Sequence, residues 1–190
     1  MNEAMWMVRA GEGAYLIEAF EKGYVAIGWN DIGDLSKIKD QEQIKQKYLQ
    51  TYPGEHLSKV NNAAAMIFKF RVLLIKGSRV LTYNPESRKY LVGEVSGEYQ
   101  YKTGVVKDYA HFRTVNWIGK VSRDKLKISS RNSLGSTLTL FNVNEEVTAD
   151  IDAVLHGSNI PETELNPIAE KEELGQLKED TVSRAHELIK

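Results

Sequence analysis

Residues 79–121 read RVLTYNPESRKYLVGEVSGEYQYKTGVVKDYAHFRTVNWIGKV. Apolar and polar residues alternate along most of this stretch, and a period of two predicts β-strands rather than helices. We expect strands over Arg79–Tyr83, Lys89–Tyr101 and His111–Val121, joined by a turn at residues 84–87 and a polar loop at residues 102–108. Consecutive strands with short connections favour an antiparallel, strongly curved sheet or a small barrel.

Three helices are expected before most of this sheet, which makes the fold class α+β. A strand at Met5–Arg9 and a buried strand at Tyr24–Trp29 enclose a helix over Ala14–Lys22. Further helices are expected over Ser36–Gln50 and from His56 to Phe70, because apolar residues recur there at helical spacing.

Two details of the chain need interpretation. Asp34 or Ser36 is expected to cap the helix that follows the turn at residues 30–34. After residue 133, Leu134, Leu138 and Phe141 fit a helix, whereas residues 137–143 alternate as a strand does. We favour a short helix there.

Composition divides the chain into two parts. Residues 66–131 hold 14 basic and 5 acidic residues, whereas residues 151–190 hold 9 acidic and 4 basic ones. We therefore expect a domain over residues 1–145 and an acidic helical linker over residues 146–190. The basic stretch fits either a solvated face answered by the acidic tail or a surface for a polyanion.

The composition of the sequence excludes several classes of protein. It has no cysteine, which removes disulfide scaffolds and thiol nucleophiles. The four histidines lie far apart, and no apolar run approaches the length of a membrane span or forms a signal peptide. We expect a cytoplasmic protein with no metal, no cofactor, no membrane partner and no nuclease active site of its own.

Aromatic residues stand at the ends of several expected strands. Trp29, Tyr83, Tyr99 and Tyr101 are each followed by polar or glycine-containing segments. An aromatic ring that faces a loop is a platform on which a nucleobase stacks, worth about 1–3 kcal/mol for each base. Taken one at a time, Tyr99, Tyr101 and Trp6 are better explained by packing at the rim of the core.

The chain resembles the EVE/YTH branch of PUA-like domains, and more narrowly the N-terminal domain of Mrr-type modification-dependent restriction endonucleases. The resemblance covers residues 6–143 and rests on segments that occur in the right order. These segments are residues 23–29 (GYVAIGW), 77–83 (GSRVLTY), 90–95 (YLVGEV), 115–118 (VNWI) and 131–133 (RNS).

This resemblance implies a curved sheet flanked by helices, with an aromatic pocket that takes a base flipped out of its stack. By position, the base-binding residues would be Trp29, Asn30, Asp31, Tyr83, Tyr99, Tyr101, Asn132 and Ser133. The residues facing the DNA backbone would be Arg79, Arg88, Lys102, Arg113 and Arg131.

Through this resemblance we expect the specificity module of a restriction nuclease, which binds double-stranded DNA carrying a modified base and cleaves nothing itself. Residues 179–190 are similar to the helical stretch that leads into the nuclease domain of these enzymes, so the expected linker would lead to a nuclease domain that this chain lacks. One alternative is an RNA-binding PUA-like module that reads a modified RNA base, because charge and aromatic residues do not separate RNA from DNA. Another is an enzyme or binding domain for a free nucleoside-like ligand. Neither the modification nor the oligomeric state follows from the sequence.

Overall fold

The computed structural model describes residues 4–157, which form one curled mixed sheet, a half-barrel flanked by helices. The strand order is β2-β6-β4-β3-β1-β7, with β5 paired to β6. The strands are β1 (Met5–Val8), β2 (Tyr24–Ile27), β3 (Arg79–Asn84), β4 (Lys89–Val95), β5 (Gln100–Val106), β6 (Tyr109–Ser122) and β7 (Leu140–Val143). The expected curved α+β sheet is confirmed, except that β1 and β3 run parallel.

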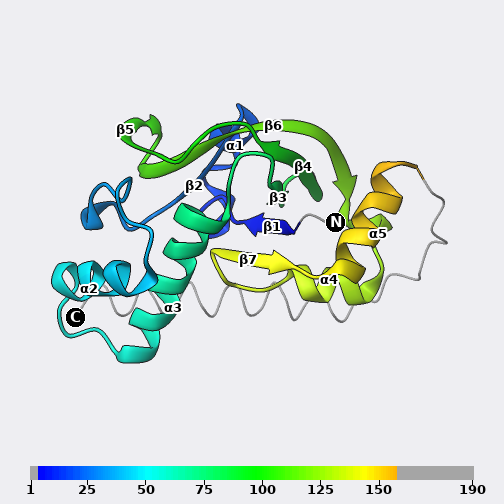
Figure 1. The fold of residues 1–190 in the computed structure, drawn as a ribbon. Helices are drawn as coiled ribbons and strands as arrows, with labels where there is room; N and C mark the ends of the chain where they lie inside the picture. The colour runs from blue at the N-terminus through cyan, green and yellow to red at the C-terminus, as the bar shows by residue number, and fades with distance from the viewer. Residues whose placement is uncertain (1–3, 158–190) are drawn as a thin grey trace.

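Strand β6 connects the two halves of this sheet. Its first half pairs with β2 and β5, and its second half pairs with β4. In Figure 1, β6 arches over the top of the sheet from β5 towards α5. The register of β4 against β6 shifts at Val92/Gly93. A Cβ atom on Gly93 would lie 2.5 Å from the carbonyl oxygen of Asn116, so this irregularity in the pairing depends on glycine.

Both faces of the sheet are buried, because side chains alternate along each strand. On β1, Trp6 and Val8 belong to one apolar cluster and Met5 and Met7 to another. The first cluster contains side chains of α1 (Ile17–Glu21), α2 (Gln41–Thr51) and α3 (Leu57–Phe68). The second contains side chains of α4 (Ile128–Leu134) and α5 (Glu145–Leu155).

The structure corrects four sequence expectations. The side chain of Asp40, rather than Asp34 or Ser36, caps α2, since it accepts a hydrogen bond from the backbone N–H of Glu42. The expected strand over residues 89–101 is interrupted after Val95, and most of the expected loop at residues 102–108 belongs to β5. The short helix expected after residue 133 is wrong, because α4 ends at Leu134 and residues 140–143 form the strand β7.

The expected linker begins inside the folded unit. Helix α5 starts at Glu145 and buries Val147 and Ile151 in the second cluster, so this part of residues 146–190 packs against the sheet. Residues 158–190 lie outside the described residues. Within residues 4–157, no helix is both long and apolar enough to span a membrane.

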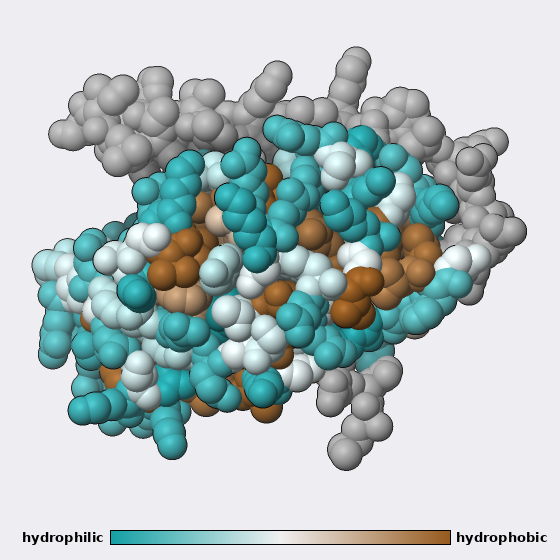
Figure 2. Space-filling model, turned by 90° about the horizontal axis from the view of Figure 1, so that it is seen from above, coloured by the Kyte–Doolittle hydropathy of each residue, from teal (hydrophilic) through white to brown (hydrophobic). Residues whose placement is uncertain are grey.

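Apolar side chains on the surface are dispersed. Figure 2 shows one face of the molecule, on which hydrophobic patches lie apart from each other among hydrophilic side chains. Ile118 of β6, with 58% of its surface exposed, is one of the largest exposed apolar residues. Single exposed apolar side chains are ordinary on protein surfaces.

Arg113 is the largest fully buried side chain, with 1% of its surface exposed. Its guanidinium donates hydrogen bonds to the carbonyl oxygens of Phe70 at 3.2 Å, Arg71 at 2.9 Å and Gly97 at 3.4 Å. Burial lowers the pKa of Arg113 to about 10, which still leaves the side chain charged at neutral pH. Arg113 therefore links the segment after α3 to the connection between β4 and β5. Its buried side chain is not exposed to a nucleic-acid backbone.

We predict that Arg113→Met destabilises the protein by at least about 2 kcal/mol, because three carbonyl groups lose a charged donor. The free energy of unfolding, measured by urea denaturation, checks this. The matched control is Lys102→Met on the exposed part of β5, which should change the free energy by less than about 0.5 kcal/mol. Equal effects of the two substitutions would contradict a structural role for Arg113.

Candidate functional site

A cavity of about 160 Å³ opens where the end of β1 meets the β3–β4 hairpin and α4. Its lining is mostly apolar or glycine, with two tyrosines and two arginines. The lining residues are Met7, Arg9, Ala10, Gly11, Gly13, Ala14, Tyr83, Pro85, Tyr90, Arg123, Leu134, Gly135 and Thr137. An engineered apolar cavity of about 150 Å³ binds benzene. This cavity therefore has room for one six-membered aromatic ring.

The turn after β1 forms one wall of the cavity. Gly11 and Gly13 have φ angles of 76° and 58°, and Ala14 also has a positive φ of 58°. A Cβ atom on Gly11 would lie 2.3 Å from the ring of Tyr15, so a larger residue here would displace this partly exposed ring and would also be strained by the positive φ. Because a left-handed conformation is uncommon for alanine, the wall is held in this shape by its surroundings.

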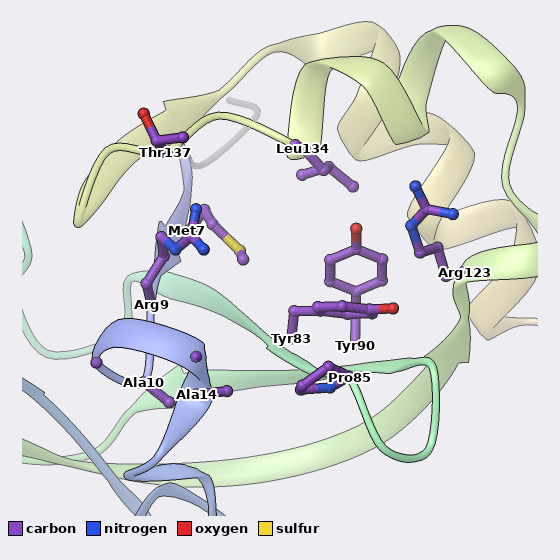
Figure 3. Close-up of a pocket in the computed structure, with 13 residues that line it drawn as sticks. Met7, Arg9, Ala10, Ala14, Tyr83, Pro85, Tyr90, Arg123, Leu134 and Thr137 are labelled. Carbon is purple, nitrogen blue, oxygen red and sulfur yellow. The ribbon is translucent and has the colours of Figure 1, made fainter. Parts of the chain in front are cut away.

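Two tyrosines form the aromatic part of the lining. Tyr83 and Tyr90 face each other across the β3–β4 pair, with ring centroids 4.7 Å apart and an interplanar angle of 38°. Tyr90 is buried, whereas Tyr83 is partly exposed. Figure 3 shows Leu134 of α4 across from the two rings. The cavity is thus an unfilled space within the second apolar cluster.

Two arginines flank the tyrosine pair, and Figure 3 shows Arg9 and Arg123 on opposite sides of it. Nη1 of Arg9 donates to the carbonyl oxygen of Ser136 at 2.7 Å. Arg123 follows directly on β6 and is 7% exposed. The lining thus contains two guanidinium groups and, among the described residues, no carboxylate side chain.

This arrangement suits a planar aromatic group attached to an anionic group. The tyrosine rings offer stacking surfaces, and the arginines attract negative charge. In the part of the chain that the structure describes, no three His, Asp or Glu side chains are grouped to hold a metal ion.

Of the base-binding residues expected from the sequence, Tyr83 alone lines this cavity. Asn132 and Ser133 are exposed on α4, next to Leu134. Asp31 is exposed in the turn after β2. Trp29, Asn30, Tyr99 and Tyr101 come together elsewhere, around the buried His111.

His111 fixes the conformation of the Trp29 turn. Its Nε2 lies 3.1 Å from the carbonyl oxygen of Trp29, and its Nδ1 lies 2.7 Å from the hydroxyl of Tyr99. A carbonyl only accepts, so Nε2 carries the proton and Nδ1 accepts from Tyr99. The Tyr99 hydroxyl in turn accepts from the N–H of Leu35. Burial raises the pKa of Tyr99 to about 12, consistent with this donor role.

The other members of this cluster are also held by contacts within the protein. Tyr101 donates to the carbonyl oxygen of Asn30 at 3.0 Å, and the side chain of Asn30 accepts from the N–H of Ala110. Trp29 is half-buried and packs against the first apolar cluster. These aromatic residues brace a turn, and the cavity described above lies elsewhere.

The expected backbone-binding residues are dispersed over the structure. Arg79 forms an ion pair with Asp152 of α5, and Arg88 forms one with Asp124 at 2.6 Å. Lys102 is exposed on β5, whereas Arg131 is buried, with 6% of its surface exposed. Arg113 lies in the interior. Of these residues, Arg88 and Arg131 lie on the same side of the molecule as Arg123, since both Arg123 and Arg131 act on the Asp124 carboxylate.

Comparison with known proteins identifies a family. The family described as a domain of unknown function, DUF8426, matches residues 5–144. The chain belongs to this family. A search of curated proteins found no match.

Solved structures similar to the DUF8426 domain share little sequence with it. The YTH domain of the Zygosaccharomyces rouxii MRB1 protein, in complex with N6-methyladenosine RNA, has a TM-score of 0.42 and 11% identity, over 83% of this chain and 90% of that one. A protein from Agrobacterium tumefaciens has a TM-score of 0.40 and 12% identity, over 85% of this chain and 99% of that one.

Sequence reasoning missed most of the cavity in the DUF8426 domain. Met7, Arg9 and Gly11 come from the end of β1, whereas Tyr90 and Arg123 are far away in sequence. The Gly11-Glu12-Gly13 pattern was the one local signal, because closely spaced glycines often mark a turn with positive φ. It was too short to indicate a binding site.

We predict that His111 makes the stability of the DUF8426 domain dependent on pH. Burial lowers the pKa of His111 below its ordinary value of 6.5, so the unfolded chain takes up this proton first. The contribution of neutral His111 to the free energy of unfolding is therefore fully present above about pH 6.5 and is lost as the pH falls towards the folded-state pKa. This contribution is about 1.4 kcal/mol for each unit by which folding lowers the pKa.

Urea unfolding at a series of pH values tests this prediction. His111→Gln should be less stable at pH 7.5 but should lose less stability on acidification between pH 7 and the folded-state pKa. His156→Gln, at an exposed position, is the matched control and should behave as the wild type does. A wild-type profile that is flat across this window would contradict the assignment.

Proposed function

We propose that this protein is a nucleic-acid-binding module that accepts a single modified base, turned out of its strand, in the cavity beside Tyr83 and Tyr90. The observation that carries the proposal is an aromatic cavity of about 160 Å³ with an arginine on either side. A base turned out of its strand brings its own phosphates with it, so it presents a flat ring and negative charge together.

The cavity favours insertion of a base over binding of an aliphatic anion. Tyr83 is partly exposed and its ring is supported by Tyr90, so the two rings give a rigid surface for stacking. Met7, Ala10 and Leu134 supply the remaining apolar contacts. A compact carboxylate or phosphate alone would leave this apolar lining without a partner.

The resemblance of the sequence to Mrr-type N-terminal domains supports duplex DNA as the partner and a nuclease domain as the unit that the module directs. In this proposal the module selects a modified site in the cytoplasm, and cleavage belongs to the nuclease domain. Stacking acts on modified and plain bases alike, and one buried methyl group adds only about 0.8 kcal/mol. Discrimination therefore also needs a penalty on the unmodified base.

We predict that Tyr83→Ala weakens binding to DNA that contains the recognised base by about 5- to 150-fold, the equivalent of about 1–3 kcal/mol of stacking. Binding to plain DNA should weaken less, because the penalty on an unmodified base keeps it out of the cavity for more of the time. Fluorescence anisotropy with duplexes that differ in one modified base measures both affinities. Tyr83→Phe keeps the ring and is the control that should retain the preference.

A substitution at Trp29 distinguishes the cavity from the site expected from the sequence. Trp29→Leu keeps an apolar side chain at a position that packs on the first cluster. We predict that the folded variant retains its preference for the modified base. If this substitution removed the preference and Tyr83→Ala did not, the base would bind beside Trp29 and the present proposal would be wrong.

We predict that the modified duplex binds in preference to the same sequence as RNA and to the free modified nucleoside, and that its affinity falls steeply with salt. Competition with unlabelled DNA, RNA and nucleoside measures this order. Tighter binding of RNA would identify a reader of modified RNA. Saturable binding of the nucleoside with little salt dependence would identify a small-molecule site.

A further inference from the structure

Two large apolar side chains are exposed beside the cavity. Among the large apolar residues that are exposed in the described part of the chain, only Tyr15 and Leu138 directly follow a residue of the cavity lining, Ala14 and Thr137 respectively. Their exposed fractions are 41% and 44%. Because single exposed apolar side chains are ordinary on protein surfaces, the position of these two residues is what distinguishes them.

The ring of Tyr15 already packs against other parts of the protein. It lies edge-to-face with the ring of Tyr109, with centroids 6.1 Å apart and an interplanar angle of 86°. Nζ of Lys107 lies 5.2 Å from its centroid. Leu138, by contrast, belongs to neither of the two apolar clusters that the described residues form. Leu138 is therefore the residue beside the cavity with apolar surface to offer a ligand.

The loop between α4 and β7 carries Leu138, and Arg9 fixes this loop on both sides of it. Nη1 of Arg9 donates to the carbonyl oxygen of Ser136 at 2.7 Å. The backbone N–H of Arg9 donates to the carbonyl oxygen of Thr139 at 2.9 Å. The N–H of Leu138 donates to the hydroxyl of Ser136 at 3.4 Å. A loop that is already fixed presents its side chain with little further loss of entropy on binding.

The same loop forms one side of the cavity. Gly135 and Thr137 belong to the lining, and Figure 3 shows Thr137 and Leu134 across the cavity from Ala14. Consecutive Cα atoms are about 3.8 Å apart, so Leu138 stands one residue beyond the lining. An exposed side chain at this position lies at the edge of the cavity.

A base that turns out of a duplex requires more than a cavity. The step that it leaves loses stacking contacts, and the base opposite loses its partner. Proteins that open or kink a duplex insert apolar side chains, leucine among them, between the separated base steps. Such a wedge has to be apolar, exposed before binding, fixed through its backbone and close to the cavity that takes the base. Leu138 meets all of these conditions.

We propose that Leu138 enters the gap that the modified base leaves in the duplex, while the base itself occupies the cavity beside Tyr83. This inference rests on the proposed function, because the gap arises only when a base turns out of double-stranded DNA. The leucine side chain replaces part of the lost stacking and blocks the return of the base. Arg9 lines the cavity and also fixes the loop of Leu138, so it joins the two parts of the site.

A wedge makes binding depend on whether the DNA is single- or double-stranded. In a single strand the modified base has no partner to leave, and no paired step has to be held open. The cavity acts on the base in both forms of DNA, whereas the wedge acts only in the duplex. A comparison of the two forms therefore separates the role of Leu138 from the role of the cavity.

The test uses the full chain and one modified strand, presented alone and paired with its complement. Leu138→Ala removes the wedge, and Leu138→Met keeps an apolar side chain of similar volume. Leu57→Ala makes the same change at the exposed first residue of α3 and is the matched control. Fluorescence anisotropy measures each affinity, and circular dichroism melting confirms that the variants are folded.

We expect Leu138→Ala to weaken binding of the modified duplex by about 5- to 50-fold, because the removed carbon atoms no longer bury apolar surface between the bases. The same variant should bind the modified single strand as the wild type does. Leu138→Met should retain both affinities. Leu57→Ala should retain both as well.

Three results would overturn this inference and leave the proposed function standing, as long as the Tyr83-dependent preference persists. Unchanged duplex binding by Leu138→Ala would show that this side chain does not fill the gap. Equal weakening of duplex and single-strand binding would place Leu138 on the strand that carries the base. An equal loss with Leu57→Ala would show that the effect is not specific to the edge of the cavity.

A failure of the proposed function appears differently in the same experiment. If the wild-type protein binds modified and plain DNA alike in both forms, no base is selected and the inference about Leu138 falls with the proposed function. If it prefers the modified single strand but not the modified duplex, the cavity reads single strands and only the wedge and the duplex partner are wrong.

Discussion

The burial of both faces of one curled sheet determines the rest of this structure. Because side chains alternate along β1, Trp6 and Val8 need cover on one face while Met5 and Met7 need it on the other. The first face receives α1, α2 and α3. The second receives α5 and the seven-residue α4, which ends at Leu134. The cavity lies beside that end, where the sheet still presents Met7, Tyr83 and Tyr90.

The two faces use polar groups in different ways. Beneath the first face, Arg113 and His111 are almost fully buried, and their nitrogen atoms bind carbonyl or hydroxyl oxygens of the chain. Such satisfied polar groups fix connections and rigidify the interior. On the second face, by contrast, Arg123 lies at a cavity and Arg131 retains unbonded donors. The half whose polar groups are fully bonded is therefore a support, and the half that holds the cavity is the one suited to a ligand.

Local patterns predicted the strands well and the site poorly, for a physical reason. Alternation of apolar and polar residues over residues 79–121 reflects the two-residue period of a strand, which is a local property. The parallel pairing of β1 with β3 joins residues more than 70 positions apart, and no local pattern reports it. An aromatic residue before a loop indicates a strand end but not the direction of its ring. Tyr99 therefore turned inwards to His111, whereas Tyr83 turned to the cavity.

The apolar lining bears directly on how a modified base would be preferred. Inserting an unmodified exocyclic amino group beside Met7, Ala10 and Leu134 leaves a donor without a partner, at a cost of about 1–3 kcal/mol. Methylation of that amino group removes one donor and adds an apolar group worth about 0.8 kcal/mol. The two effects together reach about 2–4 kcal/mol, whereas stacking and phosphate contacts cancel between the two bases. Selectivity in such a site arises because the lining has few polar groups. The amino group of an unmodified base would therefore find few hydrogen-bond acceptors there.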